Sequence, residues 1–247
     1  METREYTIQF ALEHTHWWFI ARRRFIETVF ENMDMYPLRN RRIADIGAGT
    51  GGMWRFLSHY GTVVGMEPHI LGRKLARRRG IKVSYGRAQK TGLESRSIDI
   101  VCLFDVLYHR GIDDRKALRE AYRILRPGGW LIITDCAVPW LLGPHDVAMQ
   151  ARERYVLSAL VQKVRDAGFV LRKKTYTFFL LFPFFAFKRL LARWFGQKKK
   201  PASDVKEIIP AMNSLLIMLC AAEARGLFLF SYPFGSSLLI AAQKKKE

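Results

Sequence analysis

The stretch Arg42-Ile43-Ala44-Asp45-Ile46-Gly47-Ala48-Gly49-Thr50-Gly51-Gly52 joins an apolar, β-branched run to a glycine-rich turn, and a helical pattern follows from Met53. Twenty residues after Gly47, Glu67 ends a second apolar run over residues 62–66. The glycines allow a tight turn and a close approach of the backbone to a ligand, while the acid can accept hydrogen bonds from a ribose. This spacing predicts a βαβ unit of the nucleotide-binding type.

Further blocks make this pattern specific. The turn reads G-x-G-x-G, and it is followed by Ile98-Asp99-Ile100-Val101-Cys102-Leu103-Phe104-Asp105-Val106-Leu107-Tyr108-His109 and by a helix stop with a strand at 121–133. With these blocks in order, the chain resembles the class I S-adenosylmethionine-dependent methyltransferases over residues 40–137 and again at its last strands. The resemblance implies an α/β, Rossmann-like, doubly wound fold. Its seven-stranded sheet would be mostly parallel with an antiparallel last strand. It also implies an enzyme whose cofactor is S-adenosyl-L-methionine.

The hydrophobic pattern alternates between strand and helix periods, as expected for helices on both faces of a parallel sheet. Strands are predicted at 43–46, 62–66, 82–85, 98–103, 130–135, from 168 and at 236–242, and helices at 14–32, 52–60, 69–79, 113–125 and 150–167. Residues 126–129 are predicted as a helix stop and turn, and residues 36–38 as a linker. We therefore predict an N-terminal lid helix region (1–36), a methyltransferase domain (37–175 with 232–247) and an amphipathic helical insertion (176–231).

The resemblance assigns the cofactor contacts residue by residue. It implies that the glycine turn with Asp45 holds the methionine portion and that Glu67 holds the ribose. Relatives commonly have Gly-Asp-Ala-Glu after the third strand, whereas this chain has Gly86-Arg87-Ala88-Gln89, and an arginine cannot accept a hydrogen bond. Adenine is therefore assigned to the Ala88 backbone and to Gln89. The predicted cofactor-binding residues are Asp45, Gly47, Gly49, Gly51, Glu67, Ala88, Gln89 and Asp105.

The acceptor side of the site is predicted from position, because ligands of this fold lie at the carboxyl ends of the strands. Asp105, Tyr108 and His109 follow the fourth strand and are predicted as catalytic, with the alternative that Tyr108 and His109 only pack over the cofactor. His145 is predicted as a further catalytic residue that could act as a base. An arginine can hold a phosphate with two parallel hydrogen bonds. The predicted substrate-binding residues are His16, Arg23, Arg152, Arg154 and Tyr155.

Composition and charge indicate the kind of partner. The chain of 247 residues has 41 Lys and Arg against 22 Asp and Glu, a net charge of +19, which implies an anionic partner. The three cysteines have no metal-ligand spacing, so we predict reduced thiols and no metal site. The polar N-terminus, with charges of both signs, predicts no secretory signal.

Residues 175–187 carry no charge and are rich in phenylalanine. Nine basic residues and no acidic one lie between Arg172 and Lys200, including the run Lys198-Lys199-Lys200. The apolar run is shorter than the roughly 20 residues that span a bilayer, and Pro183 interrupts it. An aromatic face flanked by cations is typical of a helix lying in the membrane interface. The alternatives are that the phenylalanines cap the sheet or form a homodimer interface.

Three functions follow from these observations. The first is a monotopic or peripheral methyltransferase at the cytoplasmic face of the membrane. It would bind anionic lipids and methylate an anionic or hydroxyl oxygen of a lipid-linked substrate, such as a polyprenyl phosphate or glycolipid. The second is a soluble methyltransferase of RNA or ribosomal protein, which is disfavoured because the cations flank apolar runs. The third is a methyltransferase-like membrane scaffold without catalysis, which the intact glycine turn disfavours.

Overall fold

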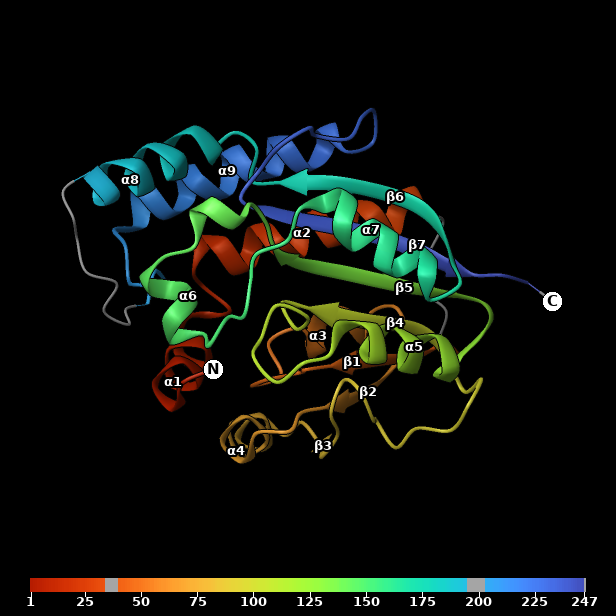
Figure 1. Ribbon diagram of the computed structural model, residues 1–247. Helices are drawn as coiled ribbons and strands as arrows, with labels where there is room; N and C mark the ends of the chain where they lie inside the picture. Colours follow the sequence, from red (N-terminus) through yellow and green to blue (C-terminus); the bar gives the residue numbers. More distant parts are fainter. Residues whose placement is uncertain (34–39, 195–202, 247) are drawn as a thin grey trace.

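A seven-stranded sheet runs through the part of the chain that this computed structural model describes, residues 1–33, 40–194 and 203–246 (Figure 1). Across the sheet the order is β3-β2-β1-β4-β5-β7-β6. The strands are β1 (Arg42–Ile46), β2 (Thr62–Met66), β3 (Val83–Ser84), β4 (Ile98–Phe104), β5 (Leu125–Cys136), β6 (Phe169–Thr177) and β7 (Ser237–Lys244). Strand β7 runs antiparallel to β5 and β6, and the other pairs are parallel. The predicted fold class is confirmed.

The parallel register brings the predicted site residues to one edge of the sheet. Ile46 at the end of β1 lies beside Met66 of β2 and beside Leu103 of β4. The loops that begin with Gly47, Glu67 and Asp105 therefore leave the sheet at neighbouring positions. This is the edge where ligands bind in doubly wound folds.

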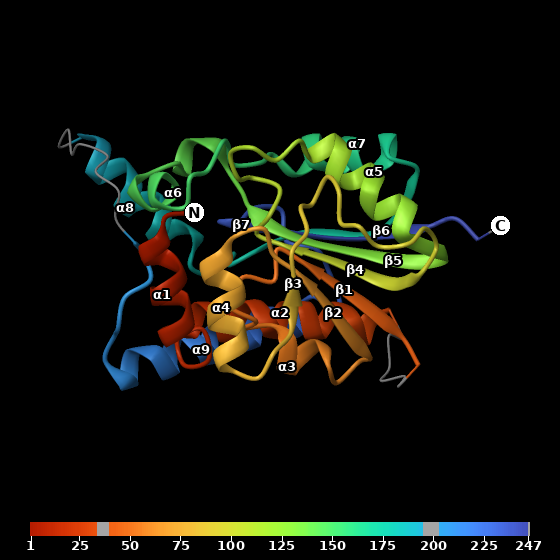
Figure 2. The same ribbon diagram turned by 90° about the horizontal axis from the view of Figure 1, so that it is seen from below.

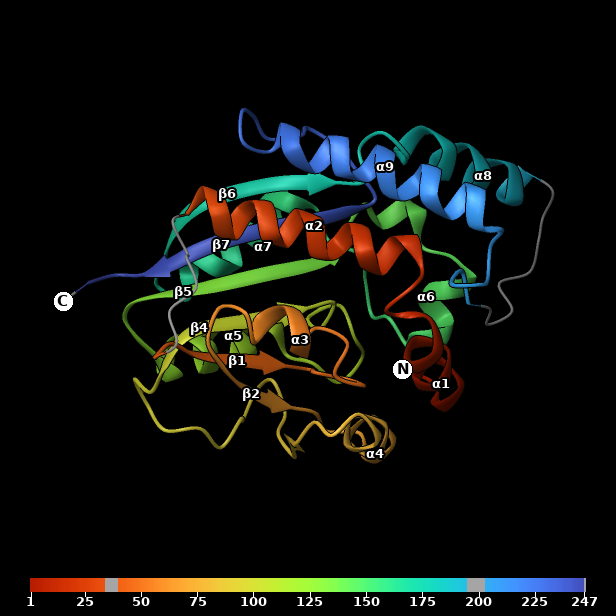
Figure 3. The ribbon, with the colours of Figure 1, turned by 180° about the vertical axis from the view of Figure 1, so that it is seen from behind.

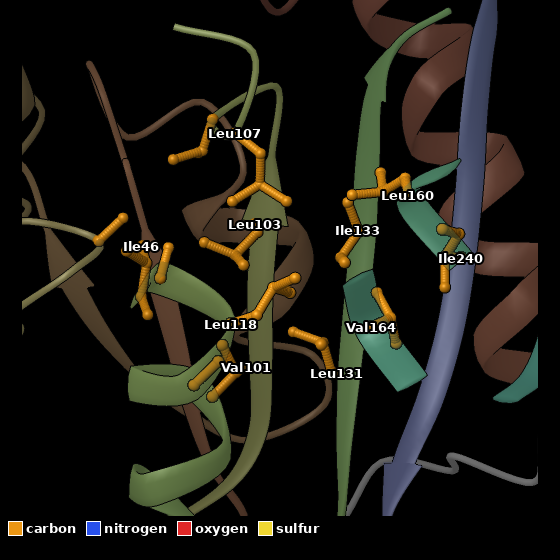
Figure 4. Packing of buried hydrophobic residues seen from close by; sticks show 14 of the residues in the cluster. Ile46, Val101, Leu103, Leu107, Leu118, Leu131, Ile133, Leu160, Val164 and Ile240 are labelled. Atoms are coloured by element: carbon orange, nitrogen blue, oxygen red, sulfur yellow. The ribbon is translucent and has the colours of Figure 1, made fainter. Parts of the chain in front are cut away.

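Helices cover both faces of the sheet, as Figure 2 shows. On one face lie α5 (Asp114–Ile124) and α7 (Leu157–Asp166), where Leu118, Leu160 and Val164 belong to the same buried cluster as Leu131 and Ile133 of β5 (Figure 4). On the opposite face lie α2 (Trp17–Asn32), the short α3 (Trp54–Leu57) and α9 (Pro210–Gly226). Both faces of the central strands are buried, which explains their nearly continuous apolar sequences.

The N-terminal region differs from the single helix predicted over 14–32. Two helices are present, α1 (Thr3–Leu12) and α2, and His16 ends the break between them by accepting a hydrogen bond from the backbone N–H of Trp18 at 3.3 Å. Helix α1 lacks a regular apolar stripe because it packs beside the glycine turn rather than on the sheet, and the periodicity therefore does not reveal it.

Two other element predictions are corrected. The helix predicted over 150–167 is present as α7 (Leu157–Asp166) but begins later, because Ala151 and Tyr155 form bridges to His109 and Ala137 in the loops after β4 and β5. A short helix α6 (Pro144–Ala148) precedes it. The expected turn at 126–129 is part of β5, which begins at Leu125 directly after α5. The predicted linker at 36–38 and the run Lys198–Lys200 lie outside the described residues.

Between β6 and β7 the chain forms α8 (Phe182–Trp194) and α9. Both lie at the same end of the molecule, but α9 packs along α2 whereas α8 lies near α6, with Phe185 stacked on Trp17 of α2 (Figures 2 and 3). The Glu223 carboxylate of α9 accepts the backbone N–H groups of Phe179 and Leu180 and so fixes the entry to α8. None of the described helices is long and apolar enough to cross a bilayer. The predicted domain boundaries stay predictions.

Candidate active site

A cavity of about 520 Å³ lies at the carboxyl edge of the sheet. Its walls come from α1 and α2, from the glycine turn after β1, from the loop after β4, from α6, and from α8 with the segment that follows it. This volume lies within the range of small-molecule sites, and the location is the one expected for this fold.

The glycine turn forms the floor of the cavity. Gly47 has a φ of +81°, and a Cβ atom there would lie 2.6 Å from Cγ2 of Val106. Only glycine satisfies both the left-handed backbone and this close approach. Gly49 also has a positive φ, and a Cβ there would meet no atom closer than 3.8 Å. The turn therefore presents bare backbone to a ligand.

Glu67 is buried and ties the turn to its neighbours. Its carboxylate accepts hydrogen bonds from the Gly49 N–H at 3.0 Å, the His69 N–H at 2.7 Å and the Tyr6 hydroxyl at 3.1 Å. A carboxylate offers about four acceptor positions, so one remains for a ribose hydroxyl. The Tyr6 ring stacks on His69 at 4.5 Å between centroids and encloses this end of the cavity.

Asp45 supplies a second acceptor. It is 2% exposed, and its Oδ2 atom has no hydrogen-bond partner in the described protein. Burial raises the pKa of this carboxyl to about 7, against the opposing effect of the Arg22 charge. A buried acceptor without a partner is costly, and a cationic donor from a ligand would relieve that cost. The residues at this end therefore fit the ammonium and the ribose of S-adenosylmethionine, at Asp45 and Glu67 respectively.

Helix α1 contributes cavity residues that the sequence did not predict. Glu5, Gln9 and Glu13 follow each other at four-residue spacing and all line the cavity. The Glu13 carboxylate accepts hydrogen bonds from the Thr50 hydroxyl and pairs with Arg79. The polar i, i+4, i+8 stripe was the available signal, because such a stripe lies on one helix face.

The loop after β4 presents Asp105 in a rare backbone conformation, with a φ of +56°. Asp105 forms an ion pair with Arg22 of α2, and Asp135 holds the loop by accepting the Leu107 N–H at 3.0 Å. Burial raises the pKa of Asp105, and the Arg22 charge opposes this shift. Ligand atoms of Asp105, Asp135 and Cys136 lie within 4.8 Å of one another, but the carboxylates already have protein partners.

Two of the histidines that line the cavity, His109 and His145, differ in their hydrogen bonds. The Nδ1–H of His109 donates to the Met149 carbonyl at 2.7 Å, which leaves Nε2 unprotonated, and burial lowers the pKa of His109 to about 4. In contrast, Nδ1 of His145 accepts the Asp204 N–H at 3.2 Å, which places the proton on Nε2. Burial lowers the pKa of His145, although the Asp204 charge opposes the shift. His109 thus differs from His145 in carrying its proton on Nδ1, and its ring also contacts the Asp105 backbone.

The predicted site residues divide into two groups. The cavity is lined by Asp45, Gly47, Gly49, Glu67, Ala88, Asp105, Tyr108, His109, His145, His16 and Arg154. The cavity is not lined by Gly51, Gln89, Arg23, Arg152 or Tyr155. Gly51 supports the turn from behind, where a Cβ would lie 2.9 Å from Ile81, and the amide of Gln89 donates to the Gly111 carbonyl.

The arginine predictions need correction because helix phase and local pairing decide where these side chains point. Arg23 donates to the Glu13 carbonyl, away from the cavity, while the adjacent Arg22 lines it. Arg152 and Tyr155 meet at Asp114, on the α5 side of the β4 loop. Arg154 reaches the cavity but is held by Asp146 at 2.8 Å.

Comparison with known proteins agrees with this geometry. Residues 44–133 match the family model described as a methyltransferase domain. The chain is 31% identical over 137 residues to a ubiquinone/menaquinone biosynthesis C-methyltransferase of Serratia proteamaculans, which covers 51% of this chain and 54% of that protein. It is 36% identical over 151 residues to a tRNA U34 carboxymethyltransferase of Azotobacter vinelandii, and this match covers 54% of this chain and 46% of that protein. It is 29% identical over 159 residues to phosphoethanolamine N-methyltransferase 3 of Arabidopsis thaliana, and this match covers 58% of this chain and 32% of that protein. The chain thus spans about a third to a half of these relatives' lengths.

Solved structures share the fold. An S-adenosylmethionine-dependent methyltransferase of Thermotoga maritima superposes with a TM-score of 0.57 at 21% identity, covering 97% of this chain and 99% of that one. Phosphoethanolamine N-methyltransferase 2 of Haemonchus contortus, in complex with S-adenosyl-L-methionine, superposes with a TM-score of 0.55 at 19% identity. This superposition covers 87% of this chain and 52% of that one. These structures show the fold alone, whereas the domain match and the curated relatives identify an S-adenosylmethionine-dependent methyltransferase domain.

Proposed function

We propose that this chain methylates an anionic or hydroxyl oxygen of a lipid-linked acceptor, such as a polyprenyl phosphate or glycolipid, while bound at the cytoplasmic membrane surface as a peripheral or monotopic protein. S-adenosylmethionine, when bound, supplies an electrophilic methyl group. The chain's own task is to bind and orient the acceptor and to exclude water.

The observation that carries this proposal is the two-sided character of α8. Its outer stripe of Phe184, Phe187, Leu191 and Trp194 is 65%, 64%, 43% and 87% exposed, at spacings that place the side chains on one helix face. Its other side lines the cavity with Phe185, Lys188 and Arg189. One helix therefore presents a large apolar surface to the exterior and cations to the site, as an enzyme with an amphiphilic, anionic acceptor requires.

The acceptor end of the cavity suits proton removal from a hydroxyl as well as binding of an anion. We propose that His109, with its unprotonated Nε2, accepts the proton of a hydroxyl acceptor, and that Asp105 and Tyr108 orient the acceptor. Burial raises the pKa of the Tyr108 hydroxyl well above its ordinary value, so this group remains a donor. An already anionic oxygen would need no base.

A second candidate, an RNA acceptor, is favoured by a different surface. Lys74, Arg77 and Arg78 of α4 (Ile70–Arg78) are exposed, and one relative named above acts on tRNA. Cations on one helix face are the usual electrostatic footprint of nucleic-acid binding. They lie at the Glu67 end of the cavity, however, away from Asp105 and His109.

A methyl-transfer assay with labelled S-adenosylmethionine separates the two candidates. The protein is supplied in parallel with a total membrane lipid extract and with total RNA. Label in the organic phase supports the lipid acceptor, whereas label only in RNA refutes it in favour of the second candidate. No label in either fraction, despite measured cofactor binding, would refute both.

Vesicle flotation tests the membrane part. Phe187→Ser removes one ring from the exposed stripe, and Ile70→Ser removes a side chain of similar exposure, 59%, from α4. We expect Phe187→Ser to weaken binding to vesicles containing phosphatidylglycerol about tenfold, because inserting half of its ring area stabilises binding by roughly 1.5 kcal/mol. Ile70→Ser should bind like the wild type. Equal binding by all three proteins would contradict membrane docking through α8.

A further inference from the structure

A short strap of residues 203–206 crosses the outer end of the cavity and touches four elements around it. Ser203 donates to Glu5 of α1 at 2.8 Å, and the backbone N–H of Asp204 donates to His145 of α6 at 3.2 Å. The Asp204 carboxylate pairs with Arg189 of α8 at 2.7 Å, and the carbonyl of Lys206 lies at His16, before α2. Asp204 and Val205 line the cavity directly.

Arg189 lies in a prepared position beside His145. Its side chain is only 15% exposed, and its guanidinium rests on Gly143 at the start of α6. A Cβ at position 143 would lie 2.2 Å from Nη1 of Arg189, so the absence of a side chain there is what admits the guanidinium. Helices α6 and α8 lie together at this end of the molecule (Figure 2).

Two of the other three described arginines that line the cavity are held by more deeply buried acids, whereas the third, Arg110, is exposed and donates to the Ala151 carbonyl at 3.3 Å. Arg22 pairs with Asp105, which is 12% exposed, and Arg154 pairs with Asp146, which is 1% exposed. The partner of Arg189 is Asp204, which is 46% exposed and belongs to the strap. Among the ion-paired arginines, an incoming anion would therefore exchange most readily at Arg189, because the competing carboxylate is already solvated and carries little desolvation cost on release.

We propose that Arg189, with His145 beside it, binds the anionic group of the acceptor, and that the Asp204 carboxylate occupies this position until the acceptor displaces it. The ligand is a phosphate monoester or similar compact anion attached to an apolar chain. Lys188, which lines the same wall and forms no ion pair with a described residue, adds a second positive charge. This assignment rests on the proposed function, for which it names the acceptor's binding group.

The direct test is calorimetric binding of farnesyl phosphate to the full chain in the presence of S-adenosylhomocysteine. Farnesol is the uncharged control with the same chain, and inorganic phosphate is the control without a chain. We expect Asp204→Asn to bind farnesyl phosphate about fivefold more tightly than the wild type, the order of effect of one partly exposed ion pair. Arg189→Gln should bind it at least tenfold more weakly. Farnesol affinity should not respond to either substitution.

Three further variants separate charge competition from other causes. Ser203→Ala loosens the strap without changing charge, and Glu27→Gln removes an acid from an exposed ion pair on α2, so both should bind as the wild type does. Gly143→Ala keeps every charge but displaces the Arg189 guanidinium, and it should weaken phosphate binding severalfold. Circular dichroism of each variant confirms that the fold is retained.

The possible results are distinct. The assignment is overturned if Asp204→Asn and wild type bind farnesyl phosphate equally, or if Ser203→Ala tightens binding as much as Asp204→Asn does. It is also overturned if inorganic phosphate responds to the same substitutions as strongly, because the site would then take a free anion. Any of these results together with retained vesicle binding and label transfer to lipid would leave the proposed function standing. Loss of vesicle binding, label transfer and farnesyl phosphate binding together would refute both.

Discussion

Replacing Glu13 by glutamine tests whether α1 is part of the cofactor site. Glu13 connects α1 to the glycine turn through the Thr50 hydroxyl and Arg79, and its side chain is 6% exposed. The fit is close, because a Cβ at Gly52 would lie 2.0 Å from Oε2 of Glu13. Glutamine keeps the size of the side chain but removes the charge that pairs with Arg79.

The expected loss of stability follows from the burial of this pair. Removing one partner of a buried ion pair costs about 3–5 kcal/mol. Arg79 also donates to the Phe10 carbonyl at 2.6 Å and the Thr50 carbonyl at 3.2 Å, and glutamine retains a neutral hydrogen bond of about 1 kcal/mol. We therefore expect a loss of about 2 kcal/mol and a decrease in Tm of about 4–8 °C.

The same change should reach the cofactor, because α1 carries Tyr6, which donates to Glu67. With its anchor weakened, α1 opens more often, and we expect S-adenosylmethionine affinity to fall about three- to tenfold. Calorimetry measures the affinity, and hydrogen exchange of residues 3–12 measures the opening. The exposed Glu31→Gln is the charge-matched control. A Glu13→Gln protein with wild-type Tm, exchange and cofactor affinity would refute the reasoning.

Three further predictions concern titratable groups around the cavity. Glu67→Gln places an amide against the N–H donors of Gly49 and His69, so we expect calorimetry to show at least tenfold weaker S-adenosylmethionine binding with unchanged vesicle flotation. The pKa of Asp45 is raised to about 7 by burial, so cofactor binding near pH 7 should release roughly half a proton. Binding enthalpies in buffers of different ionisation enthalpy measure this release, and Asp45→Asn should not show it. Burial lowers the pKa of His109 from its ordinary 6.5 to about 4. Between these pH values the unfolded state binds more protons than the folded state, so the free energy of unfolding falls as the pH drops from about 6.5 to 4, by at most about 3 kcal/mol. Urea unfolding of His109→Gln at pH 7 and 4.5 should show a smaller loss of stability on acidification than the wild type does. The same pH dependence in both proteins would contradict this prediction.

The cofactor half of the site could be predicted from the sequence because its determinants are local. A strand, a glycine turn and an acid at the end of the next strand lie within residues 42–67, and the parallel register then fixes their positions. The conformation of Gly47 follows from its neighbours in the chain. Nothing beyond the spacing of the motif was needed to place Glu67 at the cavity.

The acceptor half could not be predicted in the same way, because distant segments meet there. Asp204 reaches Arg189, 15 residues away, and His145, 59 residues away, while Ser203 reaches Glu5, 198 residues away. The choice of Arg23 over Arg22 fails for a related reason. One residue along a helix turns the side chain by about 100°, and the apolar pattern of α2 does not fix its phase to that accuracy.

The location of charge also bears on which acceptor the chain serves. The exposed cations of α4 lie on the helix that begins after His69, and none of them lines the cavity. In the proposed function the acceptor binds near Asp105, where α6 and α8 contribute to the wall of the cavity. An RNA bound along α4 would contact a surface outside the cavity, whereas Arg189 and His145 line the cavity itself. The basic surface of α4 alone is therefore a weak argument for an RNA substrate, while α8 contributes cations to the cavity wall.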